Sequence, residues 1–348
     1  MTSKPIVLIT GASGFIAAHT LDQLLEKGYR VIATVRSEAK ADIIRDAHPS
    51  LRKDQLDFAI VPDIARPDAF DEAVKTPGIE FVMHIASPVS MNYKHPSELV
   101  DPAVIGTTGI LKALARSAPS VKRVVITSST AAIMDMEREL DAKCLLNESS
   151  WNPNTLEDAI AHPENVKTAY FVSKTLAEKA AWDFVRDPAV KFDLVTINPP
   201  IVFGPVVPYF ANAESVNFSN GLILDLLRGK WKETGIPATG GVFTWVDVRD
   251  VAAAHILAIE VPEAGGKRLL TIGGTFGNRD ILEVARKNFG EKYADKLPGA
   301  DAKGGEIPPE DARCSFDSSA TDKILGIKWR NLEETIGDTI RGFQSVGV

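Results

Sequence analysis

The sequence predicts an α/β fold with a doubly wound parallel sheet, followed by a smaller, mixed α/β region. Three observations lead to this prediction. Short apolar runs alternate with longer amphipathic ones over the first 130 residues, a glycine-rich turn follows the first apolar run, and the alternation degrades after Pro199-Pro200. Such alternation is typical of parallel strands joined by crossover helices.

Each expected strand is a short run rich in Val and Ile, and each expected helix is an amphipathic stretch between two such runs. Lys27-Gly28 ends the first helix in the manner of a glycine C-terminal cap. The strands are expected at 6–9, 30–35, 56–61, 81–85, 124–127 and 192–197, and the helices at 15–26, 38–47, 67–74, 100–117 and 170–185.

The second half contains many turn-forming residues, such as Gly204-Pro205 and Gly240-Gly241. A capped helix is expected at 247–259, a strand at 268–272, and helices at 280–289 and 332–345. No flexible linker separates the halves. We therefore predict a domain at 1–198, with 199–348 forming mainly a second region from which segments return to the first.

Composition excludes several classes of protein. The 348 residues have a net charge of −7 and are 45% hydrophobic, as in a globular chain of one large or two modest domains. No apolar window spans a bilayer and no Lys/Arg block occurs, so neither a membrane nor a nucleic acid is an expected partner. Cys144 and Cys314 cannot supply a zinc site or a disulfide framework. We expect a cytoplasmic protein without a metal.

A phosphate-binding turn follows the first strand in Thr10-Gly11-Ala12-Ser13-Gly14-Phe15-Ile16-Ala17. Gly11 permits the tight turn, Gly14 lets the backbone approach a pyrophosphate, and Ala17 allows close packing of helix on strand. The alternative is a turn that only connects the two elements. The context indicates a Rossmann-type dinucleotide-binding fold, in which Gly11, Ser13, Gly14, Phe15 and Ile16 contact the cofactor.

The end of the second strand indicates which dinucleotide is bound. NAD-binding units usually place Asp or Glu there, whereas this chain has Arg36, with Lys40 one helical turn further on. Two cations suit a 2′-phosphate, so we predict NADP(H). The alternative is that Arg36 and Lys40 form a solvated face with Glu38.

Ends of the following strands should line the same cofactor, because ligands bind at the carboxyl edge of such sheets. Asp63 is expected to meet the adenine amino group, with Ile64 beside it. Ala86, Ser87 and Pro88 are expected to line the ribose side of the cofactor. Thr127, at the end of the fifth strand, is also expected to contact the cofactor.

A catalytic constellation is predicted where the fifth strand ends. Ser129 follows that strand, and Tyr170 and Lys174 share one face of a later helix. A nearby ammonium lowers the pKa of a phenol, so Tyr170 can donate a proton to a carbonyl oxygen that Ser129 holds. His84 lies in an apolar run and is expected to be a core histidine instead of an acid or base.

These motifs together resemble the extended short-chain dehydrogenases/reductases over essentially the whole chain. Within them the chain looks most like the dihydroflavonol reductase/cinnamoyl-CoA reductase-like branch, and particularly the fungal aldehyde and ketone reductases of the methylglyoxal type. Besides the segments above, the resemblance rests on Thr34-Val35-Arg36-Ser37, His84-Ile85-Ala86-Ser87-Pro88, Trp151-Asn152-Pro153, Ala177-Glu178, Asn198-Pro199, Phe203-Gly204-Pro205 and Val246-Asp247-Val248-Arg249-Asp250.

The resemblance implies a Ser129–Tyr170–Lys174 triad and NADPH-dependent reduction of an aldehyde or ketone to an alcohol. It also implies that Pro199 and Val202 lie against the nicotinamide. Val89, Thr130 and Ile201 occupy substrate-pocket positions in which relatives often have aromatic rings. One departure is Ile105, where several relatives have an Asn that helps to order a proton-relay water.

Two other functions remain open at this point. A nucleotide-sugar epimerase or dehydratase of the same superfamily also uses Tyr and Lys, but it needs cations for a diphosphate, and the second half of this chain has few Arg residues. A non-catalytic NADP-binding redox sensor would tend to lose the tyrosine or the lysine. The expected partner is a small carbonyl compound, and the expected state a monomer or homodimer.

Overall fold

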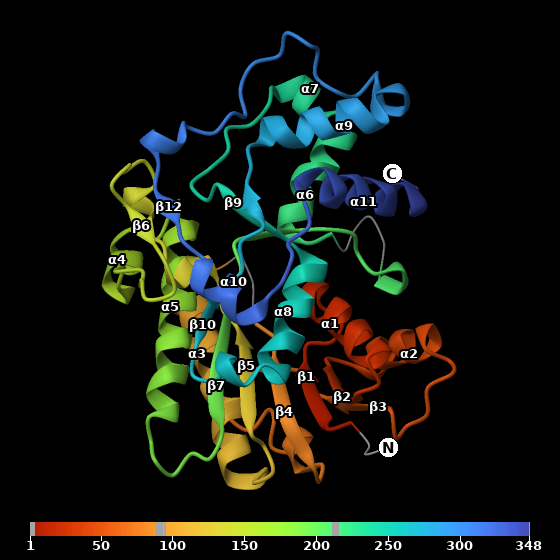
Figure 1. The fold of residues 1–348 in the computed structure, drawn as a ribbon, viewed down its shortest axis with the longest axis vertical. Coiled ribbons are helices and arrows are strands. Elements are labelled where there is room, and N and C mark those ends of the chain that lie inside the picture. Colours follow the sequence, from red (N-terminus) through yellow and green to blue (C-terminus); the bar gives the residue numbers. More distant parts are fainter. Residues whose placement is uncertain (1–3, 88–92, 94, 211–215, 348) are drawn as a thin grey trace.

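A seven-stranded sheet organises the first half of the molecule, and every neighbouring pair of its strands is parallel (Figure 1). The computed structural model describes residues 4–87, 93, 95–210 and 216–347. It confirms the predicted Rossmann-type α/β class. The strand order is β10 (Arg268–Leu270), β7 (Asp193–Asn198), β5 (Arg123–Thr127), β4 (Ile79–His84), β1 (Ile6–Thr10), β2 (Arg30–Val35) and β3 (Leu56–Ile60).

Helices cover both faces of this sheet because its strands are apolar on both sides. In β1, Val7 and Ile9 belong to one buried cluster, whereas Ile6 and Leu8 belong to the other. This follows from the two-residue period of a strand. One face packs against α1 (Phe15–Glu26), α2 (Glu38–Ala47) and α8 (Val248–Glu260), and the other against α3 (Ser97–Ser117) and α5 (Val166–Val185).

One expected helix is wrong. Residues 67–72 form turns, followed by the short 3₁₀ helix η1 (Ala73–Lys75). Phe70, Ala73 and Val74 are nevertheless buried against the sheet, so successive turns place the same apolar side chains as a helix would. Other helices begin or end a few residues away from the expected bounds, because caps such as Asn165, which accepts a hydrogen bond from Thr168 N, lie outside the apolar pattern.

The second half forms a lobe above the main sheet in the view of Figure 1. Its three-stranded sheet is covered by helices around a third buried cluster. Two of its segments return to the first half: β10 pairs with β7, and α8 packs against α1. The lobe contains β8 (Ile201–Phe203), β9 (Thr244–Asp247), β11 (Gly274–Thr275), α6 (Phe218–Leu227), α7 (Lys230–Thr234), α9 (Asn278–Tyr293) and α11 (Leu332–Ser345).

Short elements complete the described chain. A two-stranded parallel pair joins the segment after β5 to the region after α9. The remaining elements are β6 (Leu145–Leu146), β12 (Ser315–Phe316), α4 (Leu156–Ala161), α10 (Ser319–Leu325), η2 (Thr130–Ala132), η3 (Met136–Arg138), η4 (Pro208–Phe210), η5 (Pro262–Ala264) and η6 (Glu310–Ala312).

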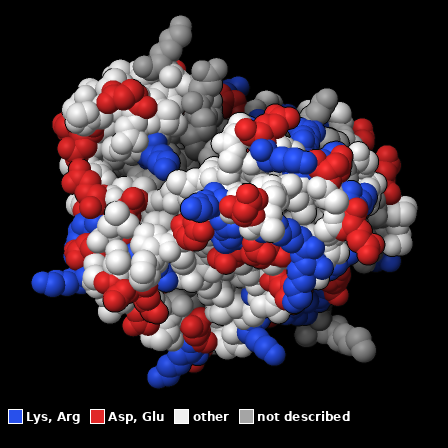
Figure 2. Space-filling view, turned by 90° about the horizontal axis from the view of Figure 1, so that it is seen from above, with Lys and Arg blue, Asp and Glu red and all other residues white. Residues whose placement is uncertain are grey.

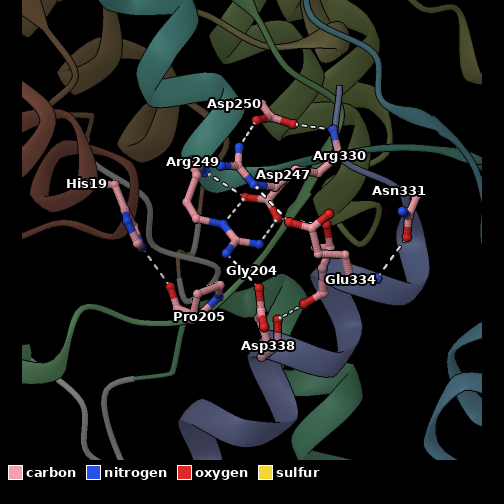
Figure 3. Close-up of polar contacts among 12 residues, drawn as sticks. His19, Gly204, Pro205, Asp247, Arg249, Asp250, Arg330, Asn331, Glu334 and Asp338 are labelled. Atoms are coloured by element: carbon pink, nitrogen blue, oxygen red, sulfur yellow. Dashed lines mark hydrogen bonds and ion pairs between the residues drawn. The ribbon is translucent and has the colours of Figure 1, made fainter. Parts of the chain in front are cut away.

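A charged cluster joins α8 to α11 and to the segment just before α11 (Figure 3). Asp247 is fully buried and caps α8 by accepting a hydrogen bond from Arg249 N, and the Arg249 guanidinium binds both Asp247 and Asp338 of α11. Burial disfavours the charge of Arg249, but the two carboxylates raise its pKa above the ordinary value. Nearby, Arg330 pairs with Asp250. These bonds hold the helix that covers the main sheet against the lobe.

Charges of both signs are interspersed on the surface seen in Figure 2, which looks onto the lobe from above. Within the described part of the chain, no helix combines the length and apolar character needed to cross a bilayer.

Candidate active site and cofactor cleft

A cleft of about 1040 Å³ opens at the carboxyl ends of the central strands. It brings together nearly all the residues that the sequence predicts for the site. Pro88 and Val89 lie outside the described residues, and Asp63 is not in the lining. Asp63 is exposed, and its carboxylate accepts a hydrogen bond from Ala65 N at 2.9 Å. The other predicted residues line the cleft: Gly11, Ser13, Gly14, Phe15, Ile16, Arg36, Lys40, Ile64, Ala86, Ser87, Thr127, Ser129, Thr130, Tyr170, Lys174, Pro199, Ile201 and Val202.

The glycine turn has the geometry that a pyrophosphate requires. Gly11 has a φ of +70°, and a Cβ there would lie 3.0 Å from Ala86 Cα. Helix α1 starts directly after Gly14, which has no side chain to cap its first amides. Free amides at a helix N-terminus attract anions. The turn is thus packed tightly against β4 on one side and open to a phosphate on the other.

The end of β2 presents two cations, Arg36 and Lys40, that form no ion pair with a carboxylate of the described residues. Glu38 pairs with Arg45 at 2.9 Å instead of with either of them. Arg36 is exposed, and Lys40 Nζ lies 5.1 Å from the centre of the Phe210 ring. Ser37 precedes α2 without making a side-chain cap bond and also lines the cleft. Sequence reasoning missed Ser37, although a serine at a helix start beside two cations is a phosphate-binding signal.

The predicted catalytic trio comes from two parts of the fold. Tyr170 and Lys174 lie one turn apart on α5, and Ser129 caps η2 just beyond β5. Ser129 Oγ accepts a hydrogen bond from Ala131 N at 3.1 Å, and Lys174 Nζ donates to Ser87 Oγ at 3.0 Å. The end of β5 and one face of α5 therefore place the three side chains in one cleft.

Burial dominates the electrostatics of this trio. It lowers the pKa of Lys174 to about 8, although Glu178 opposes the shift. It raises the pKa of the Tyr170 phenol, and a hydrogen bond with Ser129 partly opposes this. The expectation that Lys174 lowers the Tyr170 pKa is not met in this structure, since the ammonium lies 5.9 Å from the ring centre and binds Ser87.

Histidines near the site are structural. His84 is buried, bonds to Thr10 Oγ1 through Nδ1 at 2.9 Å, and has its pKa lowered to about 3 by burial and by Lys174, so the expected core histidine is confirmed. His255 of α8 bonds to Thr127 Oγ1 at 2.7 Å. Burial lowers the pKa of His255 to about 4. Both rings are neutral at physiological pH, and the Thr127 hydroxyl already has a protein partner.

A buried carboxylate supports the trio from behind. Glu178, one turn after Lys174, accepts hydrogen bonds from Arg268 Nε at 2.6 Å and from Asn198 Nδ2 at 2.7 Å, and Ser128 Oγ also donates to it. Asn198 Nδ2 in turn donates to Ser129 O. The network joins the ends of β5, β7 and β10 to α5. It therefore holds the backbone of the predicted catalytic serine.

The cleft is completed by residues that sequence reasoning did not single out. They come from segments far apart in the chain, and no local pattern marks them. They include Met136, Val166, Lys167, Phe171, Asn217, Phe218, Ser219, Gly240 and Val242.

Comparison with known proteins identifies the class of this fold and site. The family model for the NAD dependent epimerase/dehydratase family matches residues 7–273. The chain belongs to this family, within the extended short-chain dehydrogenases/reductases, as the sequence motifs predicted.

Individual relatives cover nearly the whole chain. A ketoreductase of Aspergillus niger is 40% identical over 96% of both chains. The NADPH-dependent methylglyoxal reductase GRE2 of Saccharomyces cerevisiae is 38% identical, also over 96% of both. The crystal structure of the yeast methylglyoxal/isovaleraldehyde reductase complexed with NADPH is similar with a TM-score of 0.89, at 36% identity over 98% of both chains.

Proposed function

We propose that this protein is an NADPH-dependent carbonyl reductase that converts an aldehyde or ketone to an alcohol. The observation that supports it most strongly is that one cleft joins an open glycine turn, the cations Arg36 and Lys40 at the end of β2, and the Ser129–Tyr170–Lys174 trio. The NADPH-dependent and carbonyl-reducing relatives, which align over almost their full length, support the same activity.

The cleft fits NADPH. The first turn of α1 can receive the pyrophosphate, and Arg36, Ser37 and Lys40 can hold the 2′-phosphate. Pro199 and Val202 line the other end, where the nicotinamide belongs. When bound, NADPH supplies the hydride that reaches the carbonyl carbon.

The protein's own side chains bind and protonate the carbonyl oxygen of the substrate. Ser129 Oγ donates a hydrogen bond to the carbonyl oxygen, and Tyr170 Oη gives it a proton as the carbon gains the hydride. Lys174 stabilises the resulting phenolate with its charge, and a solvent proton restores Tyr170. The products are the alcohol and NADP⁺.

Two alternatives have less support. A UDP-glucose 4-epimerase structure has a TM-score of 0.69 but only 20% identity, so it shares the fold alone. A non-catalytic NADP-binding sensor does not require the trio that this cleft assembles. We further propose a cytoplasmic location, a monomeric or homodimeric state, and a division of labour between a cofactor-binding 1–198 and a mainly substrate-binding 199–348.

Tyr170→Phe provides the direct test. NADPH consumption should be followed with a panel of aldehydes, ketones and diketones for both proteins. Loss of the phenol proton should reduce kcat by about a thousandfold, while NADPH affinity stays within a few-fold, because the proton is needed only in the chemical step. Turnover by the variant at the wild-type rate would refute the role of Tyr170, and a wild-type protein inert to the whole panel would refute the reductase.

A further inference from the structure

One charged side chain of the cleft has no task in the proposed reaction. Among the described residues, the lining contains four cationic side chains and no Asp or Glu. Arg36 and Lys40 lie at the expected 2′-phosphate position, and Lys174 belongs to the trio. Lys167 remains.

The position of Lys167 places its charge near Tyr170, at the end of the cleft where the carbonyl substrate would bind. It lies in the first turn of α5, three residues before Tyr170, and side chains so spaced are neighbours on a helix. Lys174 follows Tyr170 by one turn on the other side and binds Ser87. The Lys167 ammonium reaches toward the facing loop, where Nζ lies 3.2 Å from the position that a Cβ on Gly240 would take.

The Lys167 side chain is exposed and binds no carboxylate among the described residues, although the Glu139 carboxylate lies beside Gly241, the next residue of the facing loop. Lys167 makes no hydrogen bond or ion pair with any residue of the described chain. The N-terminal end of a helix has a positive potential, which adds to the ammonium instead of offsetting it. The lining of the same cleft also contains apolar side chains, among them Val166, Phe171 and Val242. The surroundings therefore combine one localised cation with apolar surface.

We propose that Lys167 binds a carboxylate, and that the preferred substrates are oxo acids in which an apolar chain or ring separates the carbonyl from the acid group. The inference rests on the proposed function and names its substrate class. The carbonyl at Tyr170 and the carboxylate at Lys167 lie about one helical turn apart, so a spacer of a few carbons suits the cleft. A lysine ammonium acts as a point charge and does not demand a fixed carboxylate orientation.

The test compares levulinate, in which two methylenes separate ketone and carboxylate, with its neutral methyl ester. The wild type, Lys167→Gln and Lys167→Glu are assayed for kcat/KM on both. The acid-to-ester ratio should fall about five- to tenfold in Lys167→Gln and further in Lys167→Glu, and the wild-type ratio should fall with added salt. The ester is the internal reference, so that a general change in turnover cancels in the ratio. Lys328→Gln is the matched control, since Lys328 is exposed and outside the cleft lining.

The ratio separates this inference from the proposed function. An unchanged ratio in Lys167→Gln, with the ester still reduced, would overturn the inference and leave the reductase intact. A second measurement does not depend on the ketone position. Hexanoate should inhibit reduction of a neutral ketone at least fivefold less well in Lys167→Gln than in the wild type, and equal inhibition of both would also overturn the inference.

Discussion

At the scale of single residues, the protonation of Lys174 determines the pH range of the proposed activity. Burial lowers its pKa to about 8, so the ammonium is present below that pH and is lost as pH rises through it. Tyr170 remains protonated over this range because burial raises its pKa. Burial therefore shifts the pKa values of Lys174 and Tyr170 in opposite directions, because it disfavours the charged form of each.

We predict that kcat/KM falls on the alkaline side near pH 8, because neutral Lys174 no longer stabilises the phenolate. Lys174→Arg should move this fall to higher pH, since a guanidinium stays charged. A pH profile of both proteins checks the prediction. If both lose activity at the same pH, the alkaline fall does not belong to Lys174.

Arg36 is the residue that should distinguish the two nicotinamide cofactors. It lines the cleft at the end of β2 and pairs with no carboxylate in the part of the chain that the structure describes. Arg36→Ala should weaken the NADPH interaction by about 2–3 kcal/mol, as for a charge-assisted pair, and leave NADH nearly unaffected. KM values for both cofactors measure this. Arg45→Ala is a suitable control because Arg45 lies on α2, the helix after Arg36, and pairs with Glu38 outside the cleft lining. Equal losses for both cofactors would contradict the 2′-phosphate assignment.

At the scale of secondary structure elements, Glu178 holds strand ends together. Its carboxylate receives donors from β5, β7 and β10, and its partner Arg268 also stacks on Trp151, with the guanidinium 3.8 Å from the ring centre. Both charged groups of the pair are buried. Such a pair is costly to break, because the remaining charge has no water to solvate it.

Glu178→Gln should therefore destabilise the fold by about 3–5 kcal/mol, the scale for removing one partner of a buried pair. Urea unfolding measures the change. Asp183→Asn, which removes the exposed partner of Arg186 on the same helix, should cost under about 1 kcal/mol. Similar losses in the two variants would show that the buried network contributes no more than a surface pair.

At the scale of the whole molecule, the two halves of the chain are not separable units. β10 forms the edge of the main sheet beside β7, and α8 contributes Val251, Ala254 and Ile256 to the cluster that α1 also builds. Arg249 then ties α8 to α11. A cofactor-binding region that ends before these segments lacks part of its own core.

A fragment of residues 1–198 is accordingly expected not to fold by itself. Removing β10 and α8 exposes the β7 edge and one apolar face of α1, which favours aggregation. Circular dichroism and NADPH binding of the isolated fragment test this. A soluble fragment with cooperative unfolding would mean that the first half is an independent domain.

Local sequence patterns were sufficient to predict the main sheet, the glycine turn and the trio. Strand ends of a parallel sheet meet at one edge, so Gly14, Ser129 and Tyr170 could be assigned to one cleft without coordinates. The same reasoning was wrong for the helix at 67–74, because buried Phe70 and Val74 are compatible with turns as well as with a helix.

Only the tertiary structure decided which distant residues meet. Nothing near Lys167 in the sequence indicates that it faces Gly240 across the cleft, and nothing near Arg249 indicates Asp338 as its partner. Asp63 was expected at a strand end, but β3 already ends at Ile60, and the Asp63 carboxylate accepts a hydrogen bond from Ala65 N outside the cleft lining. Periodicity reports which side of an element is buried, whereas these contacts depend on how loops from separate elements pack. The catalytic and cofactor assignments could thus be proposed from the sequence. The placement of Lys167 against Gly240 could not, because it depends on how the second half packs over the first.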